Sequence, residues 1–419
     1  MLETIVAIYT IYTFLRIYIS VMQIGFLKDQ RDQEPIILSA PKYLVAANYA
    51  IAKERVGLVE HFVDYLMFLW WTFGGFAYLA SFLGNLSTIT SSVLFLMGFV
   101  AINFLVSLPF EYYYKFKIDK DFKFNQMTPK MFFVDKLKSS VLFIFIGGAI
   151  FALLSYIISS SSHWWIWGFV VLFAVAILAN VLMPFFMGLF NKFSPLEDIE
   201  LKSDIESMMQ KVGLVSDGIF VMDASKRDSR LNAFFGGLGK SKRVVLYDTL
   251  LDKLTKKELL AVLGHELGHF SHKDIYKNLA LIGMLLFLAF FIFGNLPDEL
   301  FVQMGVVPFA GVQIAMLMLL LPLLSFIFTP VMSYLSRHNE FAADEFGSKL
   351  SSAEDLVDAL LKLVKENKAF PKAHPLVIFF YHTHPPVLER FKELGFSEDD
   401  IRDRSTLKKE GIFAFVEQE

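Results

Sequence analysis

Long apolar stretches with few or no charged residues constrain this chain more than any other feature. Of its 419 residues, 55% are hydrophobic and only 19% are charged, whereas about a quarter of a soluble domain is charged. Each stretch is close to the roughly 20 residues that a helix needs to cross a bilayer. We therefore expect a mainly α membrane protein with seven spans, at about residues 3–26, 58–83, 90–113, 139–158, 164–190, 278–296 and 306–335.

The loops between the expected spans alternate in charge. Lysines and arginines lie between spans one and two, between spans three and four, after span five and after span seven. The loops at 84–92, 159–163 and 294–305 have none. Because basic loops stay on the cytoplasmic side, we place the amino terminus outside and the carboxyl tail inside. The first apolar run has Glu3 before it and Arg16 within it, so we expect it to be retained and not cleaved as a signal peptide.

The polar parts of the chain define the rest of its organisation. We divide the chain into spans one to five (1–190), a cytoplasmic region (191–275), a transmembrane hairpin (276–337) and a cytoplasmic carboxyl-terminal region (338–419). Within the second part, the pattern predicts a short amphipathic helix at 203–212 and strands at 218–222 and 243–247. We expect Ala-Phe-Phe-Gly-Gly to lie in the loop between those strands.

The second part ends in the pattern His-Glu-x-x-His, formed by His265, Glu266 and His269. Residues four apart lie on one face of a helix, so both imidazoles can reach one metal ion. A hydrolytic zinc site has few protein ligands and keeps one position open for water, from which a glutamate can take a proton. Since so short a motif also occurs by chance, the alternative is a surface helix with two solvated histidines.

Two neighbouring features favour the metal site. Thr255 and Glu258 form a T-x-x-E capping box, so a helix is expected to begin just before the motif. Gly264 and Gly268 weaken that helix, which indicates that another segment packs closely against it.

The topology predicts a third ligand. Because spans six and seven form a hairpin, the start of the first and the end of the second lie at the same membrane face. Glu340 follows span seven and is expected to complete the ligand set, while Asp344, one turn later, is expected to accept the free N–H of a zinc-bound histidine. The alternative for both carboxylates is a solvated helix end. His272 lies nearly two turns from His265, so we expect it to be exposed or interfacial.

The composition excludes several classes of function. The chain has no cysteine, which rules out disulfides, a thiol nucleophile and thiolate metal ligands. The net charge of −3 gives no sign of nucleic-acid binding. The long apolar stretches make the lipid bilayer an expected partner.

Several motifs together resemble those of the type I CAAX prenyl proteases, which are integral-membrane zinc endopeptidases with seven spans. The motifs are His-Glu-Leu-Gly-His at 265–269, Asn-Glu-Phe-Ala-Ala-Asp at 339–344, Asn-Ala-Phe-Phe-Gly-Gly at 232–237, the run at 243–251 and Thr-His-Pro-Pro at 383–386. The stretch 124–136 is also similar. The resemblance covers essentially the whole chain, and it implies spans that enclose a chamber and a cytoplasmic zincin-like α+β metalloprotease region.

The resemblance also implies a site. It implies one Zn²⁺ per chain, Glu266 as the general base, and three metal ligands, namely His265, His269 and Glu340. Asn232 is implied to bind the substrate backbone, while His384 and Arg390 hold the substrate or the developing oxyanion. From the residues alone, His384 before two prolines and Asn232 near Gly236 are better explained as turn residues.

The resulting hypothesis is a zinc endopeptidase that removes the C-terminal tripeptide of prenylated CAAX proteins or cuts an analogous substrate. It is expected in the endoplasmic reticulum membrane of a eukaryote or the inner membrane of a prokaryote, with its catalytic region on the cytoplasmic side. One alternative is a quality-control zinc protease of the bacterial HtpX type, which has fewer spans. An alternative of another class is a polytopic transporter or scaffold with a structural metal.

Overall fold

Long helices dominate the computed structural model, which describes residues 1–214, 216–236, 243–402 and 404. Within these ranges, six helices are long and apolar enough to cross a membrane. They are α1 (Leu2–Arg31), α4 (Ile89–Tyr113, continued to Asp119 by the π-helix η2, Tyr114–Asp119), α5 (Pro129–Ser160), α6 (Trp164–Gly188), α10 (Asp274–Phe293) and α12 (Ala310–Leu350). They agree with six of the seven expected spans.

The remaining expected span, at 58–83, is not one continuous apolar helix. It begins in α2 (Ala40–Trp70), passes through the π-helix η1 (Trp71–Gly75) and ends in α3 (Phe76–Ser81). Gly74 has φ of 150°, a conformation that breaks helical geometry and that glycine adopts without a steric penalty. The last part of α2 also carries Glu60 and Asp64, which lower its hydropathy. The count of seven spans therefore stays a prediction.

The bundle has apolar side chains both in its interior and on its outer surface, as a lipid environment requires. Aromatic side chains fill its interior, where Tyr9 and Phe68 stack with ring centroids 3.7 Å apart. Other large apolar side chains point outward, and Phe14, Phe145 and Phe185 are each at least 65% exposed. Exposing so many apolar side chains is unfavourable in water, whereas contact between them and lipid is favourable.

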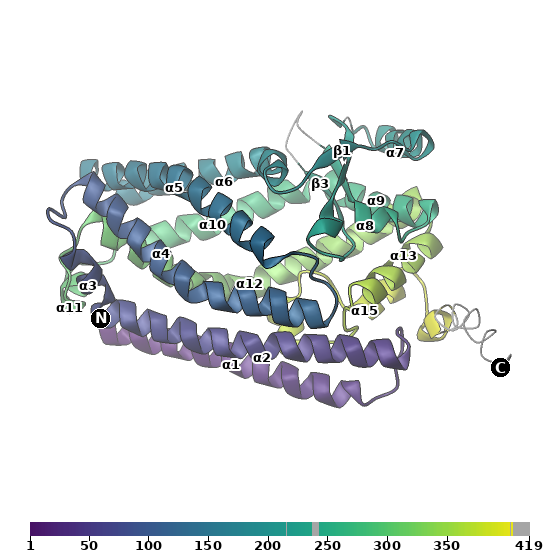
Figure 1. Cartoon of the computed structure of the whole chain (residues 1–419), viewed down its shortest axis with the longest axis horizontal. Helices are drawn as coiled ribbons and strands as arrows, with labels where there is room; N and C mark the ends of the chain where they lie inside the picture. Colours follow the sequence, from purple (N-terminus) through teal and green to yellow (C-terminus); the bar gives the residue numbers. More distant parts are fainter. Residues whose placement is uncertain (215, 237–242, 403, 405–419) are drawn as a thin grey trace.

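A small mixed sheet lies at one end of the bundle (Figure 1). Within the described residues its order is β1 (Phe193–Pro195), β2 (Ile219–Met222), β4 (Arg243–Tyr247) and β3 (Ala233–Gly236). β2 and β4 are parallel, and the other pairs are antiparallel. The expected strands are confirmed, as is a helix near 203–212, observed as α7 (Ile199–Lys211).

The expectation that Ala-Phe-Phe-Gly-Gly forms a loop is wrong for its first four residues, which form β3. Ala233 pairs with Leu246, and Gly236 pairs with Arg243. Ala233 is buried while the phenylalanines are half-buried, so the segment packs well enough to become the edge strand of the sheet. The last residue of the motif, Gly237, lies outside the described residues.

Short helices complete the fold around this sheet. At the sheet end of the bundle lie α8 (Asp248–Leu251), α9 (Lys256–Ser271), α13 (Ala353–Glu366) and α15 (Val387–Glu393), while α11 (Asp298–Gln303) lies near the amino terminus at the opposite end (Figure 1). The short helix η3 (Ala224–Lys226) follows β2, and α14 (Pro375–Tyr381) packs against α12 and α1. The expected capping box is present in α9, where Thr255 and Glu258 bond reciprocally. Helix α12 runs unbroken to Leu350, so the expected division at 337–338 falls inside one helix.

Candidate metal centre

Helices α9 and α12 approach each other so closely that their contact has room only for small residues. A Cβ added to Gly268 would lie 2.8 Å from the Cα of Ala343, and one added to Gly347 would lie 2.6 Å from the backbone nitrogen of His265. A Cβ added to Gly264 would lie 3.3 Å from the Cα of Gly347. The close packing predicted from the two glycines of the motif helix is therefore confirmed, and α12 is the segment that packs there.

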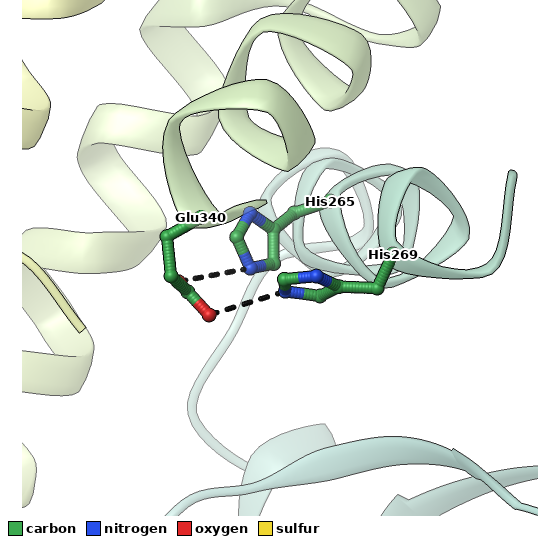
Figure 2. A group of neighbouring side chains, drawn as sticks. All are labelled: His265, His269 and Glu340. Carbon is green, nitrogen blue, oxygen red and sulfur yellow. Dashed lines mark ion pairs between the residues drawn. The ribbon is translucent and has the colours of Figure 1, made fainter. Parts of the chain in front are cut away.

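This contact brings together three side chains that can hold one ion (Figure 2). The Nε2 atoms of His265 and His269 lie 3.6 and 3.2 Å from the two carboxylate oxygens of Glu340. One ligand atom from each residue lies within 4.8 Å of the others. The hairpin of α10 and α12 thus places Glu340 beside the histidines, as expected from the topology.

The donor set fits zinc. Two imidazole nitrogens and one carboxylate are a common set in hydrolytic zinc sites, which leave a position for water. Glu340 is 3% exposed, and its Oε2 atom has no hydrogen-bond partner among the described residues. A buried carboxylate oxygen without a partner is costly, and a cation held between the two rings would satisfy it.

Each histidine is oriented by a carboxylate behind it. Asp344 lies 2.7 Å from Nδ1 of His265, the contact expected from its position one turn after Glu340. Arg390 fixes that carboxylate in turn, because its Nε and Nη2 atoms donate to Asp344 at 2.7 and 2.6 Å. Such outer contacts fix the tautomer and the direction of a ligating ring.

The corresponding partner of His269 was missed by sequence reasoning. Asp274, the first residue of α10, lies 2.9 Å from Nδ1 of His269 and is 5% exposed. Lys277 pairs with its second oxygen at 2.7 Å. The available signal was an acidic residue at the start of the helix that follows the motif.

Within the His-Glu-x-x-His motif, the pKa values of Glu266 and His269 are shifted. Burial raises the pKa of Glu266, although the neighbouring histidines oppose the shift. Burial alone would lower the pKa of His269, but its hydrogen bond to Glu340 and the charge of that carboxylate raise it to about 9. A glutamate with a raised pKa is better suited to move a proton near neutral pH.

The other predicted site residues lie in different surroundings. His384, in the link between α14 and α15, has Nδ1 2.9 Å from Oε1 of Glu340, and its side chain is 67% exposed. Asn232 is exposed at the start of the edge strand β3.

Arg390 is 9% exposed and contacts Asp344. His272 packs against Phe346 at the helix interface. The catalytic and substrate-binding roles of these residues stay predictions.

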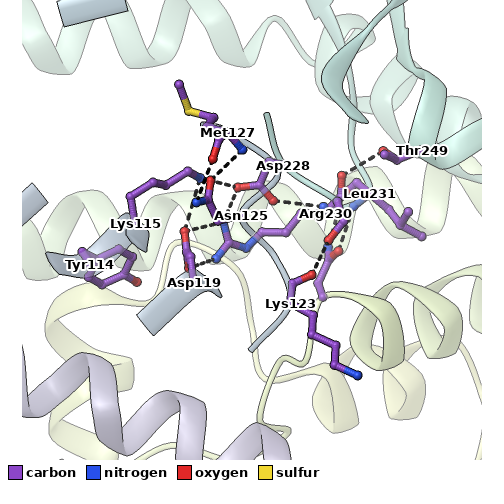
Figure 3. A network of polar contacts seen from close by, with 12 residues as sticks. Tyr114, Lys115, Asp119, Lys123, Asn125, Met127, Asp228, Arg230, Leu231 and Thr249 are labelled. Atoms are coloured by element: carbon purple, nitrogen blue, oxygen red, sulfur yellow. Dashed lines mark hydrogen bonds and ion pairs between the residues drawn. The ribbon is translucent and has the colours of Figure 1, made fainter. Parts of the chain in front are cut away.

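A second polar cluster lies at the approach to β3 (Figure 3). Arg230 donates to the buried Asp119 at 2.5 Å, to Asp228 at 2.6 Å and to Tyr49 at 2.5 Å. Lys115 also donates to Asp228, at 2.9 Å. This cluster ties the end of η2 to the loop that leads into the edge strand, and it includes part of the 124–136 stretch singled out in the sequence.

Comparisons with known proteins agree with this arrangement. The family model "Peptidase family M48" matches residues 195–396, and "CAAX prenyl protease N-terminal, five membrane helices" matches residues 33–192. The chain is 36% identical to a CAAX prenyl protease 1 homolog of Dictyostelium discoideum over 74% of its length and 75% of the relative's. The human CAAX prenyl protease 1 homolog is 35% identical, with 78% of each chain covered.

A solved structure is also similar over nearly the whole chain. The crystal structure of S. mikatae Ste24p matches with a TM-score of 0.84 and 32% identity, covering 94% of this chain and 98% of that one. Fold, ligand geometry and sequence similarity therefore lead to the same conclusion. The chain belongs to the CAAX prenyl protease 1 family within peptidase family M48, and it is an integral-membrane zinc metallopeptidase.

Proposed function

We propose that the protein removes the C-terminal tripeptide from prenylated CAAX proteins. The names of its relatives supply the substrate class, and the observation that carries the chemistry is the convergence of His265, His269 and Glu340 beside Glu266. We propose the endoplasmic reticulum membrane as the location in a eukaryote. The catalytic region lies at the end of the bundle opposite the amino terminus (Figure 1), which supports a cytoplasmic active site if the basic loops face the cytoplasm.

The proposed mechanism assigns proton transfer to Glu266. Zinc, when held by His265, His269 and Glu340, supplies a Lewis acid that activates water and polarises the peptide carbonyl. Glu266 accepts the proton of the attacking water and delivers it to the leaving amine, a task that its raised pKa favours. Asp344 and Asp274 hold the two imidazoles in position from behind.

Three further residues complete the proposed site. His384 is exposed and lies 2.9 Å from Glu340, so its ring can donate to the oxyanion that develops as water attacks. Asn232 stands at the start of β3, which has a free edge within the described sheet. An extended peptide can add to such an edge through main-chain hydrogen bonds, and the Asn232 amide can bind the peptide backbone there. We assign Arg390 to positioning Asp344 and, through it, His265.

The test of the mechanism is a Glu266→Gln variant. Cleavage of a farnesylated CAAX peptide should fall by about a hundredfold or more, while zinc content remains one per chain. Glu345→Gln is the matched control, because Glu345 is an exposed glutamate on α12. Among the described residues it forms an ion pair only with Lys349. Full activity in Glu266→Gln would refute the assignment.

The test of the substrate class compares three substrates. The farnesylated CAAX peptide should be cut faster than its unprenylated twin and faster than a misfolded membrane protein. Preference for the misfolded protein would favour the quality-control alternative, and zinc retention without any peptidase activity would favour a structural metal.

A further inference from the structure

A pocket of about 460 Å³ opens beside the metal site and is lined by His384 and Arg390. A second pocket of about 400 Å³ adjoins it. The two share Asn367, Ala369 and Phe370 as lining residues. The two pockets therefore lie side by side, and the first of them reaches His384 at the metal site.

The second pocket carries an excess of positive charge. Its ionisable lining residues include three cations, Lys53, Arg230 and Lys368, but only one carboxylate, Glu54. Arg230 is already committed to Asp119 and Asp228 (Figure 3). Neither Lys53 nor Lys368 forms an ion pair with any described residue. Their charges are thus available to an anionic ligand.

Both the backbone and the side chain of Lys368 are constrained by their surroundings. Its backbone has φ of 48°, a left-handed conformation that costs a non-glycine residue about 1 kcal/mol or more. Its ammonium lies 3.8 Å from the centroid of the Phe124 ring. Burial lowers the pKa of Lys368 despite the nearby charge of Glu366, and Arg230 adds to the lowering. A half-buried cation beside another cation gains stability when an anion binds.

The residue before Lys368 links this pocket to the edge strand. The Asn367 side chain accepts from the backbone N–H of Leu231 at 2.8 Å and donates to the carbonyl of Leu231 at 3.2 Å. Leu231 immediately precedes Asn232 and β3. The positions of Lys368 and of the proposed peptide-binding edge are therefore fixed relative to each other.

We propose that Lys368, assisted by Lys53, binds the free C-terminal carboxylate of the peptide substrate. This inference rests on the proposed function, in which the cut falls three residues before the C-terminus. Those three residues span about 10 Å when extended, and their terminal carboxylate is the one anion that every such substrate has. The pocket would thereby set the distance between the cut and the chain end.

The experiment uses the full-length enzyme and four peptides of one sequence. The peptides carry either a free C-terminal carboxylate or a C-terminal amide, each with and without a farnesyl group. The wild type should cut the carboxylate peptides about tenfold or more faster in kcat/KM than the amides, as expected for loss of a charged hydrogen bond. Lys368→Gln should remove this preference by slowing only the carboxylate peptides, and Lys368→Arg should largely restore it.

A control and two contrary outcomes complete the design. Lys365→Gln removes the same charge from an exposed position that lines neither pocket, and it should keep the preference. Equal cleavage of carboxylate and amide peptides by the wild type, or an equal loss on both in Lys368→Gln, overturns the subsite. A carboxylate preference without a farnesyl preference keeps the subsite and instead overturns the prenylated-substrate assignment.

Discussion

Substituting Gly347 by alanine should separate the two helices that form the metal site. The added Cβ would lie 2.6 Å from the backbone nitrogen of His265 and 2.8 Å from its Cα. Ordinary contact begins near 3.4 Å, so the helices must move apart by about 0.8 Å. Ligand distances in a zinc site tolerate only about 0.2 Å. Since Glu340 lies on α12 and both histidines lie on α9, the movement acts directly on the ligand set.

The magnitude follows from the cost of overpacking. Adding a methyl group to a filled interface costs about 1–3 kcal/mol. If the helices relieve this strain by separating, the binding free energy of zinc becomes less favourable by the same amount. The Kd for zinc then rises about fivefold to 150-fold. We therefore expect a weaker zinc complex and a proportional loss of peptidase activity at limiting zinc.

The assay is competition for zinc against a chelator of known affinity, with thermal unfolding measured on the same samples. Gly57→Ala is the matched control, because a Cβ at Gly57 meets nothing within 4 Å and alanine favours the helix. Zinc binding by Gly347→Ala that equals the wild type would show that the closeness of α9 and α12 does not determine the ligand geometry.

Three further outcomes are expected. Replacing Asp274 by asparagine should weaken zinc binding about tenfold to a hundredfold, because His269 loses its orienting carboxylate; the same chelator competition measures this. Zinc affinity should rise with pH up to about 9, the pKa of metal-free His269, because zinc must displace that proton; a titration that is flat between pH 7 and 9 would contradict this reasoning. Thr255→Ala should cost about 1 kcal/mol of stability by removing the helix cap, seen as a lower Tm with unchanged zinc stoichiometry.

The chemical part of the site could be predicted from sequence because its residues obey helical spacing. His265 and His269 are one turn apart, and Glu340 and Asp344 are one turn apart, so each pair shares a helix face whatever the rest of the chain does. Bringing the two pairs together required only the hairpin of apolar spans between them. The resulting contacts, 3.2 Å for His269 and Glu340 and 2.7 Å for His265 and Asp344, agree with that expectation.

The parts that sequence reasoning missed depend on tertiary contacts. Asp274 reaches His269 across the junction of two helices, where Lys273 takes a left-handed conformation with φ of 58°. β3 is a strand because β4 pairs with it, although its glycine suggested a loop. The second expected span contains the helix break at Gly74, a backbone conformation that an average of hydropathy does not represent.

The contact between α9 and α12 explains why a ligand so far along the chain can still complete a site of fixed geometry. Glu340 and the histidines are separated in sequence by a complete membrane hairpin, and thermal motion of that hairpin would change the ligand distances if nothing else held the helices. Gly264, Gly268 and Gly347 let the two backbones touch directly, so no flexible side chain lies between them at these positions. Because close-packed interiors deform little, this backbone contact sets the geometry of the site and limits the effect that motion of the hairpin has on the ligand distances.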